Sequence, residues 1–309
     1  MQITVVGGGI VGCAVAWRLA QGGARVTVCD RGRIGGEASW AGAGMLAPGG
    51  EFGEDSRWGR LGVESLAMYP EFVAELELAT GRRIDFRVCG AVEREGEAGE
   101  MERRVVAQRR MGIRVEAMGD GRWWYPDEAV VNPRDVVAAL RVAGEGLGVE
   151  YREGVEVSRG EGEVTVWAMG AWGPAAYPVK GHLIRYDLAP GSLPRIMRQG
   201  HYYVLQRATG ETIAGADMER AGFDRTLREA AVEEIREAVE AMVPELRGVA
   251  VAEAWNGLRP GSATGEPVVG RRGEGREWDA YGHFRNGILL APVTARLLCA
   301  EILPNGGRG

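Results

Sequence analysis

The sequence predicts an α/β protein in which a Rossmann-like cofactor-binding domain is interleaved with a domain built on an antiparallel sheet. Three observations support this fold class. The first 30 residues have the strand–glycine–helix–strand pattern of a parallel βαβ unit. Residues 181–216 alternate between apolar and polar side chains, as strands of an antiparallel sheet do. Apolar strand and helix patterns return near the C-terminus, so we expect the chain to cross between the two domains several times.

The βαβ unit is predicted from three segments. Residues 2–6 (QITVV) form a short β-branched run that is typical of a buried strand. Residues 10–23 (IVGCAVAWRLAQGG) are expected to form an apolar helix that two glycines terminate. Residues 25–29 (RVTVC) form the second strand, which ends at Asp30. Two parallel strands joined in this way require a right-handed crossover.

Later segments add helices and strands. A long helix is expected over residues 57–81, and a polar helix near residues 97–111. Asn132 is expected to cap a further helix that begins at Pro133. Residues 163–172 (EVTVWAMGAW) return to a strand pattern.

An amphipathic helix is predicted over residues 226–246. We expect Thr226 and Glu229 to form a capping box and Pro244 to mark the helix end. Its apolar face would consist of Leu227, Ala230, Ala231, Ile235, Ala238, Val239 and Met242.

Composition excludes several classes of function. The chain has 309 residues and a net charge of −6, and its acids and bases are interspersed, which argues against nucleic acid or an anionic membrane as a partner. No apolar run approaches the ~18 residues of a membrane-spanning helix, and the N-terminus does not resemble a signal peptide. The four cysteines lie far apart and form no C-x-x-C pair, which favours reduced thiols in a cytoplasm. The three histidines are scattered, so no metal site is expected.

A dinucleotide-binding motif follows the first strand. Gly7, Gly9 and Gly12 form G-x-G-x-x-G between a strand and a helix, where glycines allow a tight turn and a close approach of the backbone to a pyrophosphate. Asp30 lies 18 residues after Gly12, where a carboxylate can bind a ribose diol. An acid here disfavours NADP, but it does not distinguish NAD from FAD.

Motifs along the whole chain resemble those of the FAD-dependent D-amino-acid oxidase family, and within it most closely the glycine oxidases of thiamine biosynthesis. The matching motifs are GGGIVG, SWAGAGMLAP, VKGHLI, YVLQR followed by GAD and GFD, NGLRP followed by GEPVVGR, and GHFRNGILLAP.

The resemblance implies that FAD is the cofactor. It places Ile10 and Val11 at the pyrophosphate, Asp30 and Arg31 at the adenosine ribose, and Val155 beside the adenine end. The small residues of segment 35–48 (GGEASWAGAGMLAP) would cradle the cofactor, although the bulk of Trp40 within it is unexplained. The other residues that the resemblance assigns to FAD are Gly7, Gly9, Gly12, Ala38, Ser39, Ala43, Gly44, Met45, His283, Phe284, Arg285, Asn286, Gly287, Ile288 and Leu289.

A last helix, rich in apolar residues, is expected within residues 287–303 (GILLAPVTARLLCAEIL). The resemblance implies that its N-terminus points at the flavin ring, which would favour negative charge there. Because Pro292 lacks an N–H group, we expect the regular helix to begin near it, with Asn286 and Gly287 in the preceding turn.

The resemblance assigns the substrate-binding role to three residues. Arg259 matches the clamp for the substrate carboxylate, a role that suits a planar guanidinium, and Arg285 matches a second residue close to flavin and substrate. Tyr203 matches a tyrosine that helps to bind the carboxylate, but its neighbour Tyr202 leaves the register open by one residue. Without the resemblance, Tyr203 would be interpreted as a core strand residue and each arginine as a surface charge. Met218 and His201 fall near positions that line the family's substrate pocket.

The implied activity is the oxidation of glycine by hydride transfer to the flavin. Dioxygen would be reduced to hydrogen peroxide, and the imine would hydrolyse to glyoxylate and ammonia or be consumed in thiazole formation. Three alternatives remain open: an oxidase for sarcosine or small D-amino acids, a dehydrogenase slow with oxygen, and a non-catalytic FAD protein or NAD-linked enzyme. A homo-oligomer is also compatible with the sequence.

The expected domains are discontinuous. Residues 1–80, 128–178 and 255–309 would form the FAD-binding domain, and residues 81–127 and 179–254 the substrate-binding domain.

Overall fold

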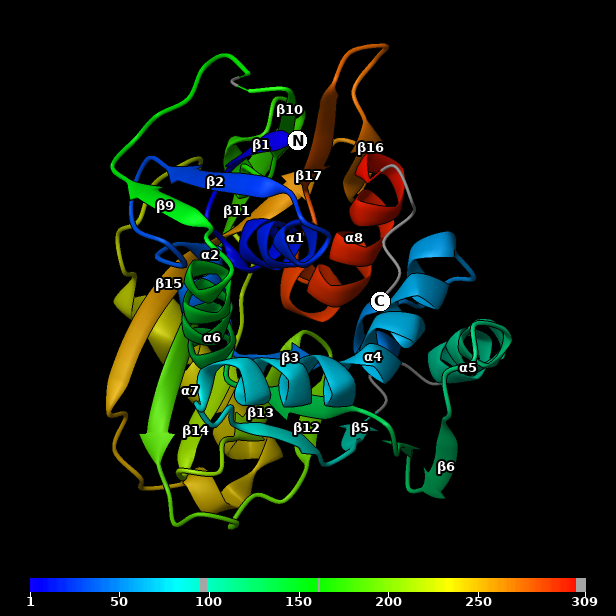
Figure 1. Cartoon of the computed structure of the whole chain (residues 1–309). Coiled ribbons are helices and arrows are strands. Elements are labelled where there is room, and N and C mark those ends of the chain that lie inside the picture. The colour runs from blue at the N-terminus through cyan, green and yellow to red at the C-terminus, as the bar shows by residue number, and fades with distance from the viewer. Residues whose placement is uncertain (95–98, 161, 304–309) are drawn as a thin grey trace.

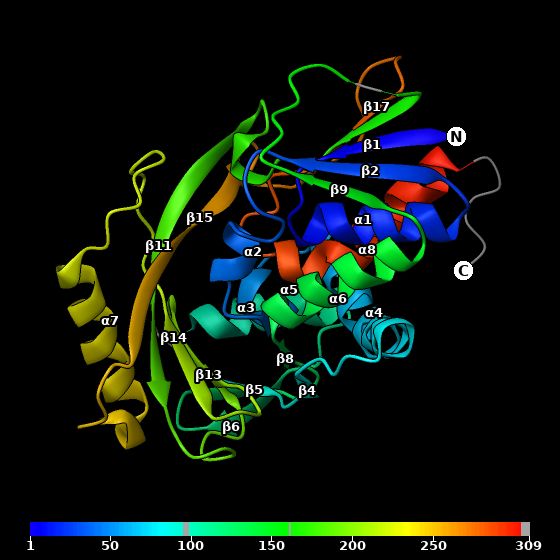
Figure 2. The same ribbon diagram turned by 60° about the vertical axis from the view of Figure 1, so that its left-hand side comes forward.

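A computed structural model describes residues 1–94, 99–160 and 162–303 of the chain. Within these residues the strands form a six-stranded, an eight-stranded and a three-stranded sheet. Figures 1 and 2 show the six-stranded sheet stacked on a layer of helices, with the long strands of the eight-stranded sheet along one side. This mixture of a parallel and a largely antiparallel sheet confirms the predicted fold class.

The six-stranded sheet has the order β16-β17-β10-β1-β2-β9, and β1 (Gln2–Val6) is buried near its centre. Every neighbouring pair is parallel except β16 with β17. The predicted βαβ unit is confirmed, because α1 (Ile10–Gln21) connects β1 to its parallel neighbour β2. The other strands of this sheet are β2 (Arg25–Asp30), β9 (Glu150–Glu153), β10 (Val164–Trp167), β16 (Val268–Arg271) and β17 (Glu277–Tyr281).

The eight-stranded sheet has the order β15-β11-β14-β13-β12-β5-β7-β6. Its pairs are antiparallel except for β12 with β5, which confirms the antiparallel pattern predicted around residues 181–216. Its strands are β5 (Ala91–Arg94), β6 (Glu116–Gly119), β7 (Arg122–Tyr125), β11 (Ala176–Asp187), β12 (Ile196–Gln199), β13 (Tyr202–Gln206), β14 (Glu211–Gly215) and β15 (Glu253–Ser262).

Long helices pack between the two large sheets. In Figure 2, α1, α6 (Pro133–Gly146) and α8 (Gly287–Ile302) lie beneath the six-stranded sheet, and α4 (Arg57–Thr80) lies against α6 and α8. The Asn132 cap is confirmed, because its side chain accepts a hydrogen bond from the Arg134 N–H at 3.1 Å. No helix in the described ranges is long and apolar enough to cross a membrane.

Short elements complete the fold. The polar helix α5 (Glu100–Arg110) is shorter than predicted, and residues 97 and 98 of that prediction lie outside the described residues. The others are α2 (Ala38–Ala41), α3 (Pro48–Glu51), the 3-10 turns η1 (Gly170–Trp172) and η2 (Pro244–Leu246), and the strands of the three-stranded sheet, β3 (Met45–Leu46), β4 (Phe86–Val88) and β8 (Ala129–Val131).

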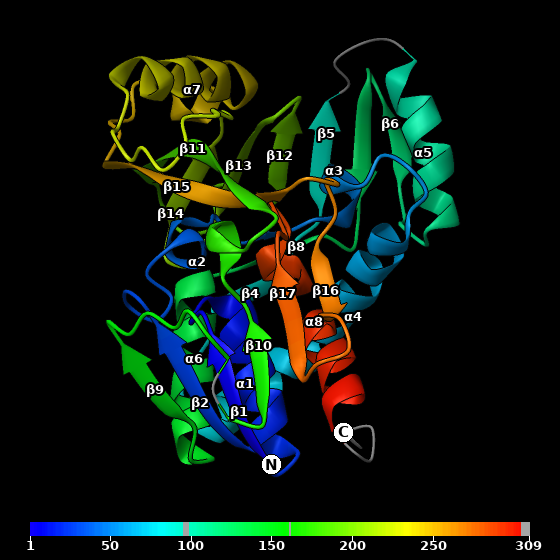
Figure 3. The ribbon, with the colours of Figure 1, turned by 90° about the horizontal axis from the view of Figure 1, so that it is seen from above.

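Helix α7 (Glu229–Met242) covers the face of the eight-stranded sheet that is turned away from the other long helices (Figure 3). It ends before Pro244 as predicted, but the capping box at its start is wrong. Both the N–H and the hydroxyl of Thr226 donate to Asp224, and the helix begins only at Glu229. The predicted apolar face therefore lacks Leu227, which precedes the helix and is exposed.

The predicted start of α8 near Pro292 is also wrong. The helix begins at Gly287, five residues earlier, and Pro292 lies inside it. A proline there leaves the carbonyl of Ile288 without its usual donor. The Tyr69 hydroxyl of α4 donates to that carbonyl at 2.5 Å, while Ser65 donates to the Leu289 carbonyl at 2.6 Å. These two hydroxyls allow the helix to continue through the proline.

We expect Tyr69→Phe to reduce the free energy of unfolding by about 1–3 kcal/mol, because it leaves the partly buried Ile288 carbonyl unsatisfied. In a Pro292→Ala background, which restores the missing N–H, the same substitution should cost much less. Chemical denaturation of the two single variants and the double variant measures this coupling. Additive losses would contradict the proposed compensation.

Candidate active site

A cavity of about 350 Å³ lies between the two large sheets. Its wall is formed by the turn from β1 to α1, the end of β2, α2 and β3, and η1. The long strands β11 and β15 and the start of α8 complete it. Segments from the beginning, middle and end of the chain therefore meet at one site.

In the turn before α1, the backbones of Gly7 and Gly12 lie in close contact because neither residue has a side chain. Gly7 has φ +108°, and a Cβ atom at Gly12 would lie 1.9 Å from the Gly7 carbonyl oxygen. The N–H of Ile10 at the helix start donates to the Ser39 hydroxyl at 2.9 Å. The amino end of α1, which is the positive end of the helix dipole, thus faces the cavity as an anion site would require.

Asp30 stabilises the same turn. One of its carboxylate oxygens accepts from the Gly8 N–H and the other from the Gly32 N–H, each at 2.7 Å. A carboxylate has about four acceptor positions, so these two bonds leave capacity for a ribose diol. Beside it the Arg31 guanidinium lies 4.0 Å from the ring of Trp172, which also lines the cavity.

Segment 35–48 follows the cavity wall, and its small residues are required by close neighbours. Gly44 has φ +93°, and a Cβ atom there would lie 1.8 Å from the Val131 carbonyl oxygen. Trp40 points the other way. Its ring packs edge-on against Trp255 at 6.3 Å and beneath the Arg134 guanidinium at 4.1 Å, which accounts for the one bulky side chain.

The loop before α8 joins two of the sequence motifs. The Phe284 N–H donates to the Pro260 carbonyl at 2.8 Å, and Phe284 has the unusual φ of +50°. His283 is buried, with its Nε2 atom 3.1 Å from the Thr294 hydroxyl. Burial lowers the pKa of His283 to about 4, so this imidazole is neutral at neutral pH.

Three polar side chains gather at the other end of the cavity. Arg259 lies with its guanidinium against Gly181, where a Cβ atom would be 2.1 Å from it, and donates to the Asp217 carbonyl at 3.0 Å. Arg285 donates to the Glu51 carboxylate at 3.0 Å. Tyr203 is buried in the same wall, and burial raises its pKa.

Arg259 and Arg285 differ in whether a carboxylate neutralises their charge. The Glu51 carboxylate, only 11% exposed, neutralises Arg285. Among the described residues no carboxylate lies within 4.0 Å of Arg259, and burial lowers the pKa of its guanidinium. A cation that is desolvated without a counter-ion is costly unless a ligand supplies one. The end of the cavity near Arg259 is therefore suited to a carboxylate.

Nearly all residues that the sequence assigns to the site line this cavity. The exceptions are Gly12, Asn286 and Leu289. Gly12 packs against the Gly7 carbonyl in the turn before α1, Asn286 precedes α8, and Leu289 is buried in the core. Of the two adjacent tyrosines it is Tyr203 that faces the cavity, whereas Tyr202 packs with the cluster under α7.

Met218 and His201 do not line this cavity. Met218 is half-exposed, and His201 lines a second, polar hollow that shares Glu51, Tyr203 and Arg285 with the cavity wall. Sequence reasoning missed Glu51, Met169 and Trp172, which also line the cavity, and the glycine after the strand in WAMGAW was the signal for the last two. Glu37 lines the cavity within segment 35–48, and Gly181 and Leu183 line it within the VKGHLI motif, but the sequence assigned no individual role to them.

Comparisons with known proteins agree with this geometry. The sequence profile of the DAO family, described as FAD dependent oxidoreductase, matches residues 2–301. The glycine oxidase of Pseudomonas aeruginosa is 32% identical over 96% of this chain and 93% of its own length. The crystal structure of glycine oxidase from Geobacillus kaustophilus superposes with a TM-score of 0.91 at 26% identity, covering 97% of this chain and 94% of that one.

A longer relative is the bifunctional protein ThiO/ThiG of Trichormus variabilis. It is 31% identical over 98% of this chain, but the match covers only 52% of its own length. The chain therefore spans about half of this relative.

We expect Gly12→Ala to abolish retention of FAD, because the new methyl group would force the Gly7 carbonyl away from the start of α1. Gly146→Ala is the matched control, since a Cβ atom there meets open space. The ratio of flavin to protein absorbance after purification measures the effect. Equal flavin content in both variants would contradict it.

His283 should make stability pH-dependent. Its folded-state pKa lies below the ordinary 6.5, so acidification protonates the unfolded chain first. From pH 6.5 to about pH 4, wild type should lose about 3 kcal/mol relative to His283→Asn. Denaturant unfolding of both proteins across this range measures the difference, and a constant difference would refute the interpretation.

Proposed function

Since the chain belongs to the DAO family of FAD-dependent oxidoreductases, we propose that it catalyses the oxidative deamination of glycine. Glycine, dioxygen and water would give glyoxylate, ammonia and hydrogen peroxide, and in thiazole formation for thiamine biosynthesis the imine would be consumed directly. The observation that carries this proposal is the position of Arg259, a guanidinium without a carboxylate partner among the described residues, in the cavity wall.

The residues around the cavity fit FAD. A pyrophosphate needs backbone N–H groups without side chains in the way, and the Gly7–Gly12 turn with Ser39 provides that surface. We propose that Asp30 and Arg31 bind the adenosine ribose. The flavin would be bordered by residues 283–289 and by Ala38, Ser39, Ala43, Gly44 and Met45. When bound, FAD would supply the acceptor for the hydride that leaves the substrate α-carbon.

We propose that the chain itself contributes binding, orientation and electrostatics. Arg259 would pair with the substrate carboxylate, with the Tyr203 hydroxyl as an additional donor. Arg285, neutralised by Glu51, would border the same space without competing for the carboxylate. The amino end of α8 would favour negative charge at the flavin. Holding the α-carbon in place would lower the entropic part of the barrier.

The domain division proposed from the sequence suits this arrangement. Residues 1–80, 128–178 and 255–309 contain all strands of the six-stranded sheet, within the described residues. The boundaries at 178/179 and 254/255 fall inside β11 and β15, because these two strands run from one proposed domain into the other.

Anaerobic mixing of the purified protein with glycine tests the activity. We expect the absorbance of oxidised flavin to be lost, and admission of oxygen should restore it with release of hydrogen peroxide. Sarcosine, D-alanine and D-proline are tested in parallel. If one of these bleaches the flavin and glycine does not, the substrate assignment is wrong, and if none does, amine oxidation itself is wrong.

Arg259→Ala should retain FAD but raise the KM for glycine by about a hundredfold or more, because the carboxylate would be desolvated without a partner. Arg271→Ala is the control, since Arg271 is exposed on β16 and outside the cavity wall. Steady-state kinetics and flavin content distinguish the two variants. An unchanged KM in Arg259→Ala would remove the clamp assignment.

A further inference from the structure

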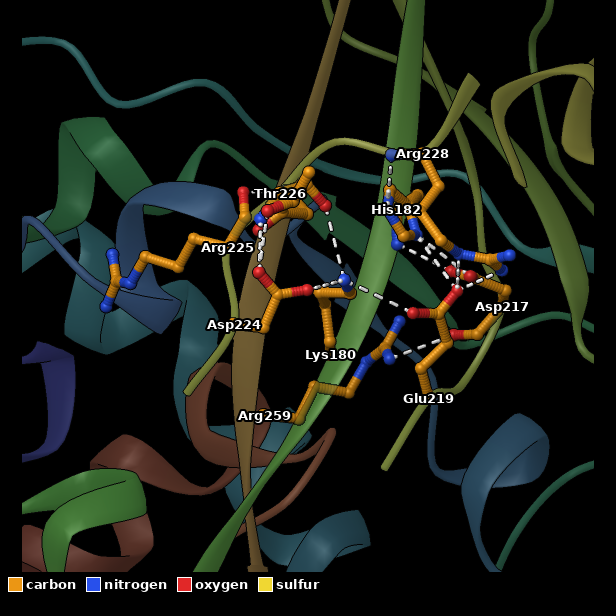
Figure 4. Close-up of polar contacts among 10 residues, drawn as sticks. Lys180, His182, Asp217, Glu219, Asp224, Arg225, Thr226, Arg228 and Arg259 are labelled. Atoms are coloured by element: carbon orange, nitrogen blue, oxygen red, sulfur yellow. Dashed lines mark hydrogen bonds and ion pairs between the residues drawn. The ribbon is translucent and has the colours of Figure 1, made fainter. Parts of the chain in front are cut away.

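The segment between β14 and α7, residues 216–228, contacts both ends of the cavity wall, and we call it the strap. Near its start the Asp217 carbonyl accepts the hydrogen bond from Arg259. Further along, Phe223 stacks on Trp172 at 5.2 Å, and Arg225 forms an ion pair with Glu37. Figure 4 shows the strap beside the long strands β11 and β15, with the Arg259 side chain reaching toward it.

Lys180 of β11 fastens the middle of the strap. Its ammonium donates to the Asp224 carboxylate at 2.8 Å and to the Thr226 carbonyl at 3.2 Å, and it pairs with Glu219 at 3.3 Å (Figure 4). An ammonium has three N–H donors, so each of them has an acceptor here. The backbones of Lys180 and Glu219 are also joined by two hydrogen bonds of 2.9 Å.

The identity of this residue is informative. Lys180 is the only lysine in a chain with 37 lysines and arginines, and its side chain is only 1% exposed. A compact ammonium can meet three acceptors that surround one point, whereas the planar fork of arginine cannot. This site therefore requires the one basic side chain that the chain otherwise avoids.

His182, two residues further along β11, fixes the start of the strap. Its N–H and its Nδ1 atom both bind the Asp217 carboxylate, at 2.6 and 2.8 Å. Its Nε2 atom accepts from the Arg228 N–H at 3.3 Å. Because Nε2 accepts a hydrogen bond, Nδ1 is the ring nitrogen that donates to the Asp217 carboxylate. His182, Asp217 and Glu219 have the ligand types of a metal site, but both ring nitrogens already have hydrogen-bond partners.

We propose that Lys180 is a positioning residue for the reaction. By fastening the strap to β11 it holds the Asp217 carbonyl that directs the Arg259 guanidinium into the cavity. Lys180 itself does not line the cavity, so it acts through Arg259. This inference rests on the proposed function, in which Arg259 binds the substrate carboxylate.

Lys180→Met tests the proposal, with Arg185→Met as the matched control. Arg185 lies on the same strand and has the carboxylates of Asp187, Glu211 and Glu253 within 4.0 Å, but it does not touch the strap. We expect Lys180→Met to raise the KM for glycine about tenfold while kcat falls less than about twofold, because orientation of the clamp affects binding. Glycolate carries the carboxylate of glycine but a hydroxyl in place of the amine, so it reports binding without turnover. Its Kd, read from the perturbed flavin spectrum, should rise by the same factor.

Limited trypsin digestion of the holoenzyme measures the fastening without any turnover. The strap contains Arg220, Arg225 and Arg228, and cleavage there should be faster in Lys180→Met than in wild type or Arg185→Met. If Lys180→Met does not fold, Asp224→Ala removes the shortest contact at a partly exposed carboxylate and should change the same quantities in the same direction.

The outcomes separate the two proposals. Equal effects of Lys180→Met and Arg185→Met, or an unchanged Kd for glycolate in Lys180→Met, would overturn the positioning role. Failure of glycine to reduce the wild-type flavin would instead overturn the proposed function. In that case faster cleavage of the strap in Lys180→Met still supports the fastening, and equal cleavage refutes it.

Discussion

The antiparallel pairing of β11 with β15 is the interaction on which the rest of the structure depends. The register runs without interruption from Ala176 opposite Ser262 to Arg185 opposite Glu253. Because the two strands are long, they also form part of the cavity wall. The Arg259 guanidinium lies over Gly181, and Gly257 comes so close to segment 35–48 that a Cβ atom there would lie 2.5 Å from that of Ala41.

This pairing explains why small residues occur in two distant parts of the sequence. Trp255 of β15 donates to the Ala41 carbonyl at 3.0 Å, which fixes the distance between the strand and α2. Any larger side chain at this contact would push the strand away and open the cavity. The contact between β15 and α2 therefore sets the width of the site.

The charged side chains of the cavity are not all paired. The site contains two guanidinium groups, of which only one has a carboxylate partner among the described residues. The neighbouring side chains add no charge: burial raises the pKa of the Tyr203 hydroxyl and lowers that of the His283 imidazole. Arg259 is therefore the group that a bound carboxylate would neutralise, and its hydrogen bond to the Asp217 carbonyl in the strap fixes the direction of its guanidinium.

The sequence by itself determined the parts of this protein that depend on neighbouring residues. The glycines between β1 and α1, the acid at the end of β2 and the cap at Asn132 are local features, because turn geometry and helix capping involve residues close in the chain. The resemblance of its motifs then indicated the cofactor and the residues around it.

Only the tertiary structure decided the rest. The start of α8 could not be read from Pro292, because the donor that replaces its N–H is Tyr69, more than 200 residues away. Thr226 could not be excluded as a cap without its contact to Asp224. The choice of Tyr203 over Tyr202, the pairing of Arg285 with Glu51 and the direction of Arg259 all depend on contacts between strands and loops distant in sequence, and such contacts leave no periodic signal.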